Sequence, residues 1–267
     1  MDIEYILSRW EEWAAVKPKL LKPLGGHSNK SYLVQAGQEK FVIRINIADQ
    51  TLGVDRQREI KVLNRIKGFD FSPTILAQNE HYMVTKFIEV EQDQALPPEE
   101  MAKLFKLIHG LSYTEGTVLN PFEKINDYLE KISEENQKLQ QVNHSIQNLI
   151  EDSVQSLEKN INCFCHNDLL PENIMQTKQG IKIIDWEYAQ LGNPLFDLAV
   201  YMEHMEYSDI ESKRLLLAYD KTIDPALLTK WRLVVVFINL LWWKIKKPRE
   251  DMLPGLLNLE FRLNLLS

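Results

Sequence analysis

The chain has few cysteines and no excess of positive charge, and each shortage excludes a class of protein. Two cysteines in 267 residues cannot build the disulfide framework of a small secreted domain. A net charge of -7 gives no sign of the basic surface that nucleic-acid-binding proteins use, so we expect no nucleic-acid partner. The net negative charge is compatible with a small cationic ligand.

Long apolar runs are also scarce. The most apolar segment, residues 233–243 (LVVVFINLLWW), is shorter than the roughly 18 to 20 residues of a membrane span, so we expect a buried helix and no membrane insertion. The first residues are acidic and lack the apolar stretch of a signal peptide. Together with the low cysteine content, this predicts a protein of the reducing cytoplasm.

The pattern of residues in the first third of the chain indicates a small antiparallel sheet with one inserted helix. Alternating apolar residues predict strands, and apolar residues three or four apart predict helices. The predicted elements are an amphipathic helix at 3–15, strands at 31–36 and 40–46 joined by a turn at Gly37, a helix within 55–68 and two strands within 73–90.

Helices dominate the rest of the chain, starting with PPEE at residues 97–100, where prolines and acids favour a helix start. Short apolar strands return at NCFCHND, IMQT and IKIIDW. The fold class is therefore α+β. We predict an N-lobe with the nucleotide-binding sheet at 1–90, a linker near 89–98, and a mainly helical, catalytic and acceptor-binding C-lobe at 91–267. A cleft between two such lobes is a common ligand site.

One segment, CFCHNDLLPENI at residues 163–174, allows three interpretations: a metal site, a redox pair or a catalytic loop. His166, Asp168 and Asn173 have the H-x-D-x4-N spacing of the kinase catalytic loop. Phosphoryl transfer needs a carboxylate that orients the attacking hydroxyl and accepts its proton, and Asp168 is the candidate. It also needs an oxygen ligand for Mg²⁺ a short loop away, which Asn173 would supply.

Further parts of the kinase template occur elsewhere in the chain. Asp185 ends the apolar strand in IKIIDWEYA, where a second Mg²⁺ ligand is expected. Arg44 in FVIRIN stands where the template has a strand lysine, and Glu59 in QREIKVL stands where its ion-pair partner belongs. GGHSNKSY offers backbone N–H groups and a hydroxyl to phosphates, and the backbone from residue 86 onward is expected to meet adenine. The predicted nucleotide-binding residues are Ser28, Asn29, Arg44, Glu59, Lys86, Phe87 and Ile88.

These segments resemble the choline/ethanolamine kinase family, within the aminoglycoside-phosphotransferase and protein-kinase-like fold group. The similarity is carried by LGGHSNKSYLV, FVIRIN, LIHGL, CHNDLLPENI, IIDWEYAQLGNPLFDLAVYMEH and LLWWKI, and DWEYA is the most specific part. The resemblance implies a bilobal kinase-like fold, ATP and Mg²⁺ as cofactors, and a cationic amino alcohol as acceptor, for which we favour choline. Few residues separate Asp185 from NPLFDLA and no A-P-E sequence follows, which leaves little platform for a peptide substrate.

A quaternary ammonium group donates no N–H hydrogen bond and is held by aromatic faces and nearby carboxylates. The resemblance implies Glu187, Tyr188, Glu203 and Trp243 as the residues of the cationic pocket. Because Trp242 and Trp243 are adjacent on a predicted helix, we expect one of them to lie in the core.

Other chemistry-bearing residues have structural interpretations. Cys163 and Cys165 face one side of a strand, so we interpret them as reduced thiols packed beneath the loop. A zinc site with His166 is disfavoured, because the three residues are too close in sequence and no second ligand cluster follows. We interpret His166 as hydrogen-bonding the loop, Asp197 as a capping or loop-bracing residue, and His109 as a packed histidine.

Other functions are compatible with the same kinase-like motifs. Ethanolamine, thiamine or an aminoglycoside are alternative acceptors, and an aminoglycoside favours a pocket with more acids and fewer aromatic residues. A nucleotide-binding pseudokinase is a different class, against which the retention of Asp168, Asn173 and Asp185 argues. The sequence gives no indication of the oligomeric state.

Overall fold

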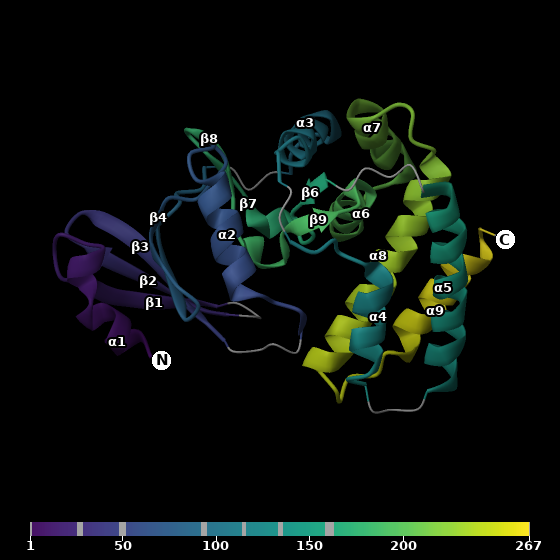
Figure 1. Cartoon of the computed structure of the whole chain (residues 1–267), viewed down its shortest axis with the longest axis horizontal. Coiled ribbons are helices and arrows are strands. Elements are labelled where there is room, and N and C mark those ends of the chain that lie inside the picture. The colour runs from purple at the N-terminus through teal and green to yellow at the C-terminus, as the bar shows by residue number, and fades with distance from the viewer. Residues whose placement is uncertain are drawn as a thin grey trace. The chain divides into compact units, whose positions relative to one another are not determined.

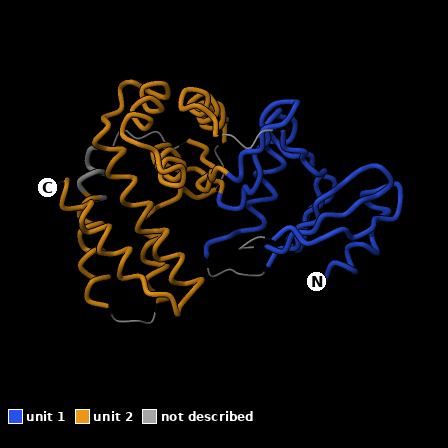
Figure 2. Tube along the Cα trace, turned by 180° about the vertical axis from the view of Figure 1, so that it is seen from behind, with its two compact units in different colours: residues 1–94, 172–188 blue, residues 95–171, 189–267 orange. Residues whose placement is uncertain are grey.

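The structure is a computed structural model that describes residues 2–25, 29–47, 52–91, 95–113, 116–132, 136–157 and 163–266, without the side chains of residues 150 and 152–157. The chain divides into two compact units (Figure 2). The first comprises residues 1–94 and 172–188, and the second comprises residues 95–171 and 189–267. The segment 172–188 therefore belongs to the first unit, although it lies far along the chain.

A five-stranded antiparallel sheet forms the centre of the first unit, with the strand order β1-β2-β3-β5-β4 (Figure 1). The strands are β1 Lys19–Gly25, β2 Asn29–Ala36, β3 Glu39–Asn46, β4 Ile75–Gln78 and β5 Tyr82–Lys86. Ala36 pairs with Glu39 across a two-residue turn, in which Gly37 has a φ of 64°. Such tight hairpins require a positive φ, which glycine adopts without steric cost.

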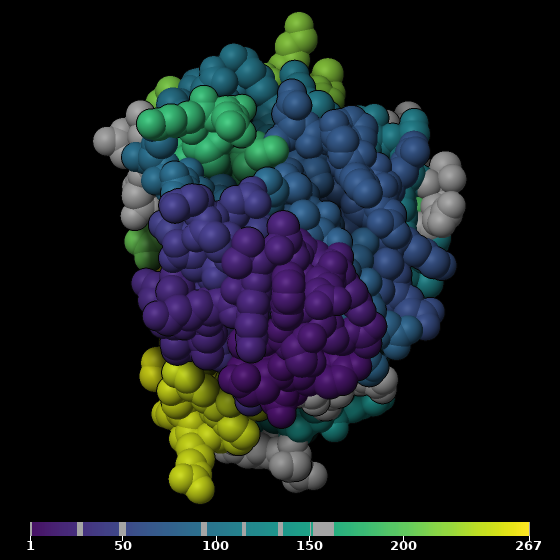
Figure 3. Space-filling view, turned by 90° about the vertical axis from the view of Figure 1, so that its left-hand side faces the viewer, coloured from purple at the N-terminus to yellow at the C-terminus, as the bar shows by residue number. Residues whose placement is uncertain are grey.

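The N-terminal segment packs on this sheet and differs from the prediction. The expected helix at 3–15 is wrong in length: α1 covers Ile3–Ser8, and a 3₁₀ turn follows at Trp10–Glu12. The turn directs Trp13 onto Phe41, with the ring centroids 5.4 Å apart and edge to face. Buried apolar residues of α1 and of β2, β3 and β5 form one core cluster. From outside, the N-terminal strands and α1 make a continuous surface, purple in Figure 3.

Helix α2, Arg56–Ile66, and a late hairpin complete the first unit. Asp55 caps α2 by accepting a hydrogen bond from the Arg58 backbone at 3.0 Å. The hairpin pairs β7, Ile174–Thr177, with β8, Gly180–Ile183, and a 3₁₀ turn at Trp186–Tyr188 packs against α2. The Ile183 N–H donates to the Phe71 carbonyl at 2.8 Å, which joins the hairpin to the rest of the unit.

The second unit is mainly helical, as predicted. Its helices are α3 Pro98–His109, α4 Pro121–Leu129, α5 Gln137–Leu157, α6 Pro194–His204, α7 Asp209–Tyr219, α8 Pro225–Lys246 and α9 Leu253–Asn264. Its two short strands, β6 Cys163–Cys165 and β9 Gln190–Gly192, pair antiparallel. Proline in the first turn and an Asn or Asp cap begin α4, α6 and α8, because proline at that position loses no helical hydrogen bond.

Helix α8 is the long apolar element of the second unit (Figure 1). By length and composition it is the one helix among the described residues that could cross a membrane. It packs against α4, α5, α6 and α9, and eight of its residues are buried, including Trp231 and Phe237. This packing is typical of the core helix of a folded domain, which can be as long and as apolar as a membrane-spanning helix.

Candidate active site

The β7–β8 hairpin brings the two predicted magnesium ligands to the same end of the first unit. Asn173 directly precedes β7, and one residue, Ile184, separates the end of β8 from Asp185. Ile174 pairs with Ile183, and the Ile184 N–H donates to the Asn173 carbonyl at 3.0 Å. The antiparallel pairing therefore places an amide and a carboxylate, both hard oxygen donors, on adjacent chain segments.

Asp185 has a strained backbone, with a φ of 63°, in the left-handed region that few residues other than glycine adopt. Its side chain is 34% exposed, and its Oδ1 lies 3.4 Å from Nη1 of Arg44. Such strain persists only where the surroundings enforce it, and it is frequent at functional sites.

Arg44 and Glu59 form the predicted ion pair. Nη2 of Arg44 donates to both carboxylate oxygens of Glu59 at 2.7 Å, and its Nε donates to Asn46 at 3.0 Å. Burial alone would raise the pKa of Glu59, but the charges of Arg44 and Arg56 outweigh it and hold that pKa below its ordinary value. Glu59 is therefore ionised at neutral pH and fixes the guanidinium of Arg44.

A second arginine extends this network and was missed by the sequence reasoning. Nη1 of Arg56 donates to Glu59 at 2.8 Å and to Glu187 at 2.9 Å, and Nη2 donates to Asn29 at 2.7 Å. Asn29 in turn donates to Glu187 at 2.9 Å. Glu187 is only 1% exposed. Two residues predicted to meet ligands, Asn29 and Glu187, thus have buried partners inside the first unit.

In the second unit, the backbone before Asp168 is held by a buried carboxylate. The N–H groups of His166 and Asn167 donate to the two oxygens of Asp197 at 2.8 and 2.5 Å. Asn167 has a φ of 61°, and the Leu170 N–H donates to the Asp168 carbonyl at 2.8 Å. Asp168 itself is half-buried. Asp197 therefore braces the loop that carries the predicted catalytic carboxylate.

Gly192 lies against this loop from β9. A Cβ at this position would be 2.9 Å from Oδ1 of Asn167 and 3.6 Å from Sγ of Cys165. The close approach leaves no room for a side chain.

Tyr128 on α4 has a buried hydroxyl without a hydrogen-bond partner among the described residues. Burial raises its pKa, with smaller contributions from the charges of Asp168 and Asp127. No sequence motif pointed to this residue.

Glu203 of α6 is enclosed by two arginines from other helices. Arg232 of α8 donates to it through Nε at 2.5 Å, and Arg262 of α9 donates through Nη1 at 3.0 Å and Nη2 at 2.9 Å. Burial opposes ionisation of Glu203, but the two guanidinium groups keep its pKa below the ordinary value. The negative charge predicted to meet a cationic acceptor is thus balanced internally.

The two late tryptophans lie at the surface together. The prediction that one of them is core is wrong: Trp242 is half-buried and Trp243 is 38% exposed. Their rings stack with centroids 6.0 Å apart, which adjacent helix positions at the end of α8 permit. Trp243 donates to Glu250 at 2.7 Å, and Nζ of Lys247 lies 3.9 Å from its ring centroid. The ring therefore already binds a cation from its own chain.

The other predicted ligand-binding residues have fewer described contacts near the candidate site. Ser28 lies outside the described residues, and Tyr188 is half-buried in the turn that also contains Glu187. Lys86 and Phe87 use their backbone N–H groups within the sheet, donating to Thr74 and Lys40 at 2.9 Å. The predicted adenine contact of this segment therefore depends on its other backbone groups, including those of Ile88.

Known proteins resemble this chain over most of its length. The sequence profile described as "Choline/ethanolamine kinase" matches residues 21–231. Protein LicA of Haemophilus influenzae is 24% identical over 249 residues, covering 85% of this chain and 73% of that protein. The choline kinase LicA structure from Streptococcus pneumoniae has a TM-score of 0.81 at 22% identity, covering 92% and 94% of the two chains. A structure of LicA in complex with AMP has a TM-score of 0.83 at 21% identity, covering 99% and 98%. These structures confirm the predicted kinase-like fold.

Proposed function

The chain belongs to the choline/ethanolamine kinase family, and from this premise we propose that it transfers the γ-phosphoryl group of ATP to the hydroxyl of choline, forming phosphocholine and ADP. The observation that carries the proposal is the β7–β8 hairpin, which brings Asn173 and Asp185 to one end within the family's matched region. A bound AMP in a related LicA structure supports an adenine nucleotide as the donor.

The residues present fit a magnesium–nucleotide complex. Asn173 and Asp185 would hold Mg²⁺, which prefers hard oxygen ligands. When bound, Mg²⁺ neutralises phosphate charge and orients the γ-phosphoryl group. Arg44 adds a fixed positive charge beside Asp185, and Glu59 keeps its guanidinium in place. This pairing supports a phosphate-binding role for Arg44.

Asp168 is proposed to orient the acceptor hydroxyl and to accept its proton. Its preceding backbone is fixed by Asp197 through the two N–H groups described above. Because positioning supplies most of the acceleration in phosphoryl transfer, a rigid loop favours this role.

For the acceptor, we propose a small cation recognised largely by aromatic faces. Tyr188 and Trp243 offer such faces, whereas Glu187 and Glu203 already pair with arginines. At Trp243, a cationic acceptor would replace Lys247 on the ring. The cytoplasm is the proposed location, because it supplies ATP and keeps Cys163 and Cys165 reduced.

An acceptor screen tests the function. ADP release from ATP and Mg²⁺ should be measured with choline, ethanolamine, thiamine and an aminoglycoside, and choline should give the highest kcat/KM. Ethanolamine is the second candidate, since the matched family includes kinases of both amino alcohols. Turnover of another acceptor without turnover of choline would refute the substrate proposal.

The mechanism is tested by Asp168→Asn, which should lower kcat by about 10²-fold or more, because the carboxylate that accepts the proton is lost. Asp209→Asn, at an exposed aspartate of the same unit, is the matched control and should leave kcat unchanged. A kcat of Asp168→Asn within a few-fold of the parent would rule out the proposed base.

A further inference from the structure

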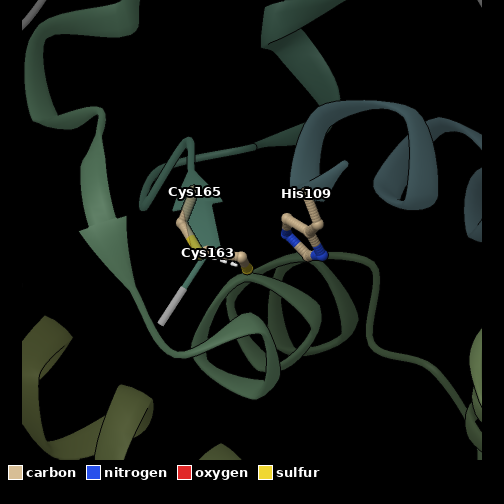
Figure 4. Close-up of side chains that lie close together, drawn as sticks. All are labelled: His109, Cys163 and Cys165. Carbon is tan, nitrogen blue, oxygen red and sulfur yellow. Dashed lines mark hydrogen bonds between the residues drawn. The ribbon is translucent and has the colours of Figure 1, made fainter. Parts of the chain in front are cut away.

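Three side chains with metal-binding atoms meet at one point of the second unit. His109 ends α3, and Cys163 and Cys165 are the first and last residues of β6. Their ligand atoms all lie within 4.8 Å of one another (Figure 4). We propose that these three residues form a binding site for a thiophilic divalent cation, namely Zn²⁺. This site is separate from the proposed kinase chemistry.

The distances suit zinc. The two sulfur atoms lie 3.6 Å apart, whereas two thiolates about 2.3 Å from a tetrahedral Zn²⁺ are about 3.8 Å apart. An imidazole nitrogen in the same tetrahedron lies about 3.6 Å from each sulfur. Side-chain rotations that close roughly 1 Å are therefore enough to complete three of the four positions.

The imidazole ring of His109 is held by a partner at each nitrogen. Its Nε2 lies 3.1 Å from Oδ2 of Asp197, and its Nδ1 lies 2.9 Å from the Tyr219 hydroxyl. A proton on Nε2 donated to Asp197 leaves a lone pair on Nδ1, which the Tyr219 hydroxyl occupies by donating to it. A carboxylate behind a histidine fixes ring and tautomer in this way in many zinc sites. Zinc would take the place of the Tyr219 hydroxyl at Nδ1.

The charge balance also suits a partly buried site. Zinc binds cysteine as the thiolate, so each cysteine loses its proton when zinc binds; burial raises the pKa of the Cys165 thiol, and the neighbouring Cys163 and Asp197 raise it further. The two protons pass to solvent, and the two thiolates then balance the charge of Zn²⁺. Cys163 is half-buried, which leaves a route for the ion and a fourth position for water. Sulfur and imidazole donors select against Mg²⁺, which binds oxygen.

The ion would connect two distant parts of the chain next to the catalytic loop. The sequence disfavoured zinc because His166 is too close to the cysteines, but the fold supplies His109 from another helix instead. β6 leads directly into His166 and Asp168, and Asp197 binds both His109 and the loop backbone. We expect zinc to brace the strand beneath the loop and to raise the thermal unfolding temperature.

The chain has two cysteines, both in this cluster, so thiolate signals report on this site alone. Reduced full-length protein should retain one equivalent of Zn²⁺ after gel filtration, measured by elemental analysis. Co²⁺ in its place should give a thiolate-to-metal charge-transfer band, and Zn²⁺ should protect both thiols from alkylation. Cys163→Ser and His109→Gln should each lose the metal, whereas His144→Gln, at an exposed histidine of the same unit, should retain it.

Three outcomes would overturn the proposal. The first is that the reduced wild-type protein retains no zinc and its thiols are alkylated equally fast with and without added Zn²⁺. The second is that Cys163→Ser retains a full equivalent. The third is that the only reaction of the pair is a Cys163–Cys165 disulfide under oxidation. The alkylation and Co²⁺ measurements use wild-type protein, so they decide the question even if a variant fails to fold.

Discussion

Replacing Arg56 by methionine measures how far the buried ion-pair network stabilises the first unit. The Arg56 side chain is 13% exposed and donates to Glu59, Glu187 and Asn29. Methionine keeps the chain length and helix propensity at the start of α2 but removes these bonds. Glu59 retains both bonds from Arg44, whereas Glu187 retains one hydrogen-bond donor among the described residues, the Asn29 amide, together with the charge of Arg44 without a hydrogen bond to it.

The expected cost comes mainly from Glu187. Breaking a buried ion pair from one side costs about 3–5 kcal/mol, because a charge stays buried without its partner. Each lost bond to a charged group contributes about 1.5–3 kcal/mol, which is consistent with that range. We therefore expect Arg56→Met to lower the free energy of unfolding by about 3–5 kcal/mol. In a Glu187→Gln background the same change should cost about 2 kcal/mol less, which is the coupling between the pair.

Urea unfolding at neutral pH, followed by circular dichroism and tryptophan fluorescence, measures both quantities, provided that the two probes give one transition. Arg9→Met, at an exposed arginine that pairs with Glu12, is the matched control and should not shift the urea midpoint. A cost below about 1 kcal/mol, the range of exposed pairs, would refute the reasoning. So would an equal cost in both backgrounds.

Three further predictions concern the second unit. Gly192→Ala should lower kcat by about 10-fold to 100-fold in steady-state assays, because its Cβ would displace Asn167 beside Asp168, the proposed catalytic carboxylate; an unchanged kcat would contradict this. The depressed pKa of Glu203 adds stability above the ordinary glutamate pKa, and that stability is lost as the pH falls through the folded pKa. The urea midpoint should therefore fall in acid, and less steeply in Glu203→Gln. Tyr128→Phe removes a buried hydroxyl without a partner, so the melting temperature should stay constant or rise, and a clear fall would reveal a hidden partner.

The sequence predicted the contacts near the candidate site that are set by local spacing. Asn173 and Asp185 flank a short hairpin, and hairpin pairing follows from the alternation of nearby residues. Arg44 and Glu59 were found because they occupy fixed positions on one strand and the next helix. The fold class followed from the change of periodicity between the two halves of the chain.

Contacts between distant segments could not be predicted from the sequence. Arg56 pairs with Glu187 across more than a hundred residues, and neither spacing nor periodicity links them. Glu203 was likewise expected to meet a ligand. Its arginine partners lie on two later helices, and nothing in the sequence indicated that they pack against it. Helix propensity also missed the break after Ser8, which tertiary packing of Trp13 explains.

The division of the chain has a consequence for its synthesis on the ribosome. The first 94 residues emerge long before the segment 172–188 that completes their unit. At roughly 5 to 20 residues per second, the delay is about 5 to 20 s. During this time Arg56 has no Glu187, and Phe71 lacks the ring of Trp186 that packs on it at 5.8 Å. The nascent first unit therefore stays incomplete while residues 95–171 of the second unit, which include most of the proposed catalytic loop, are translated.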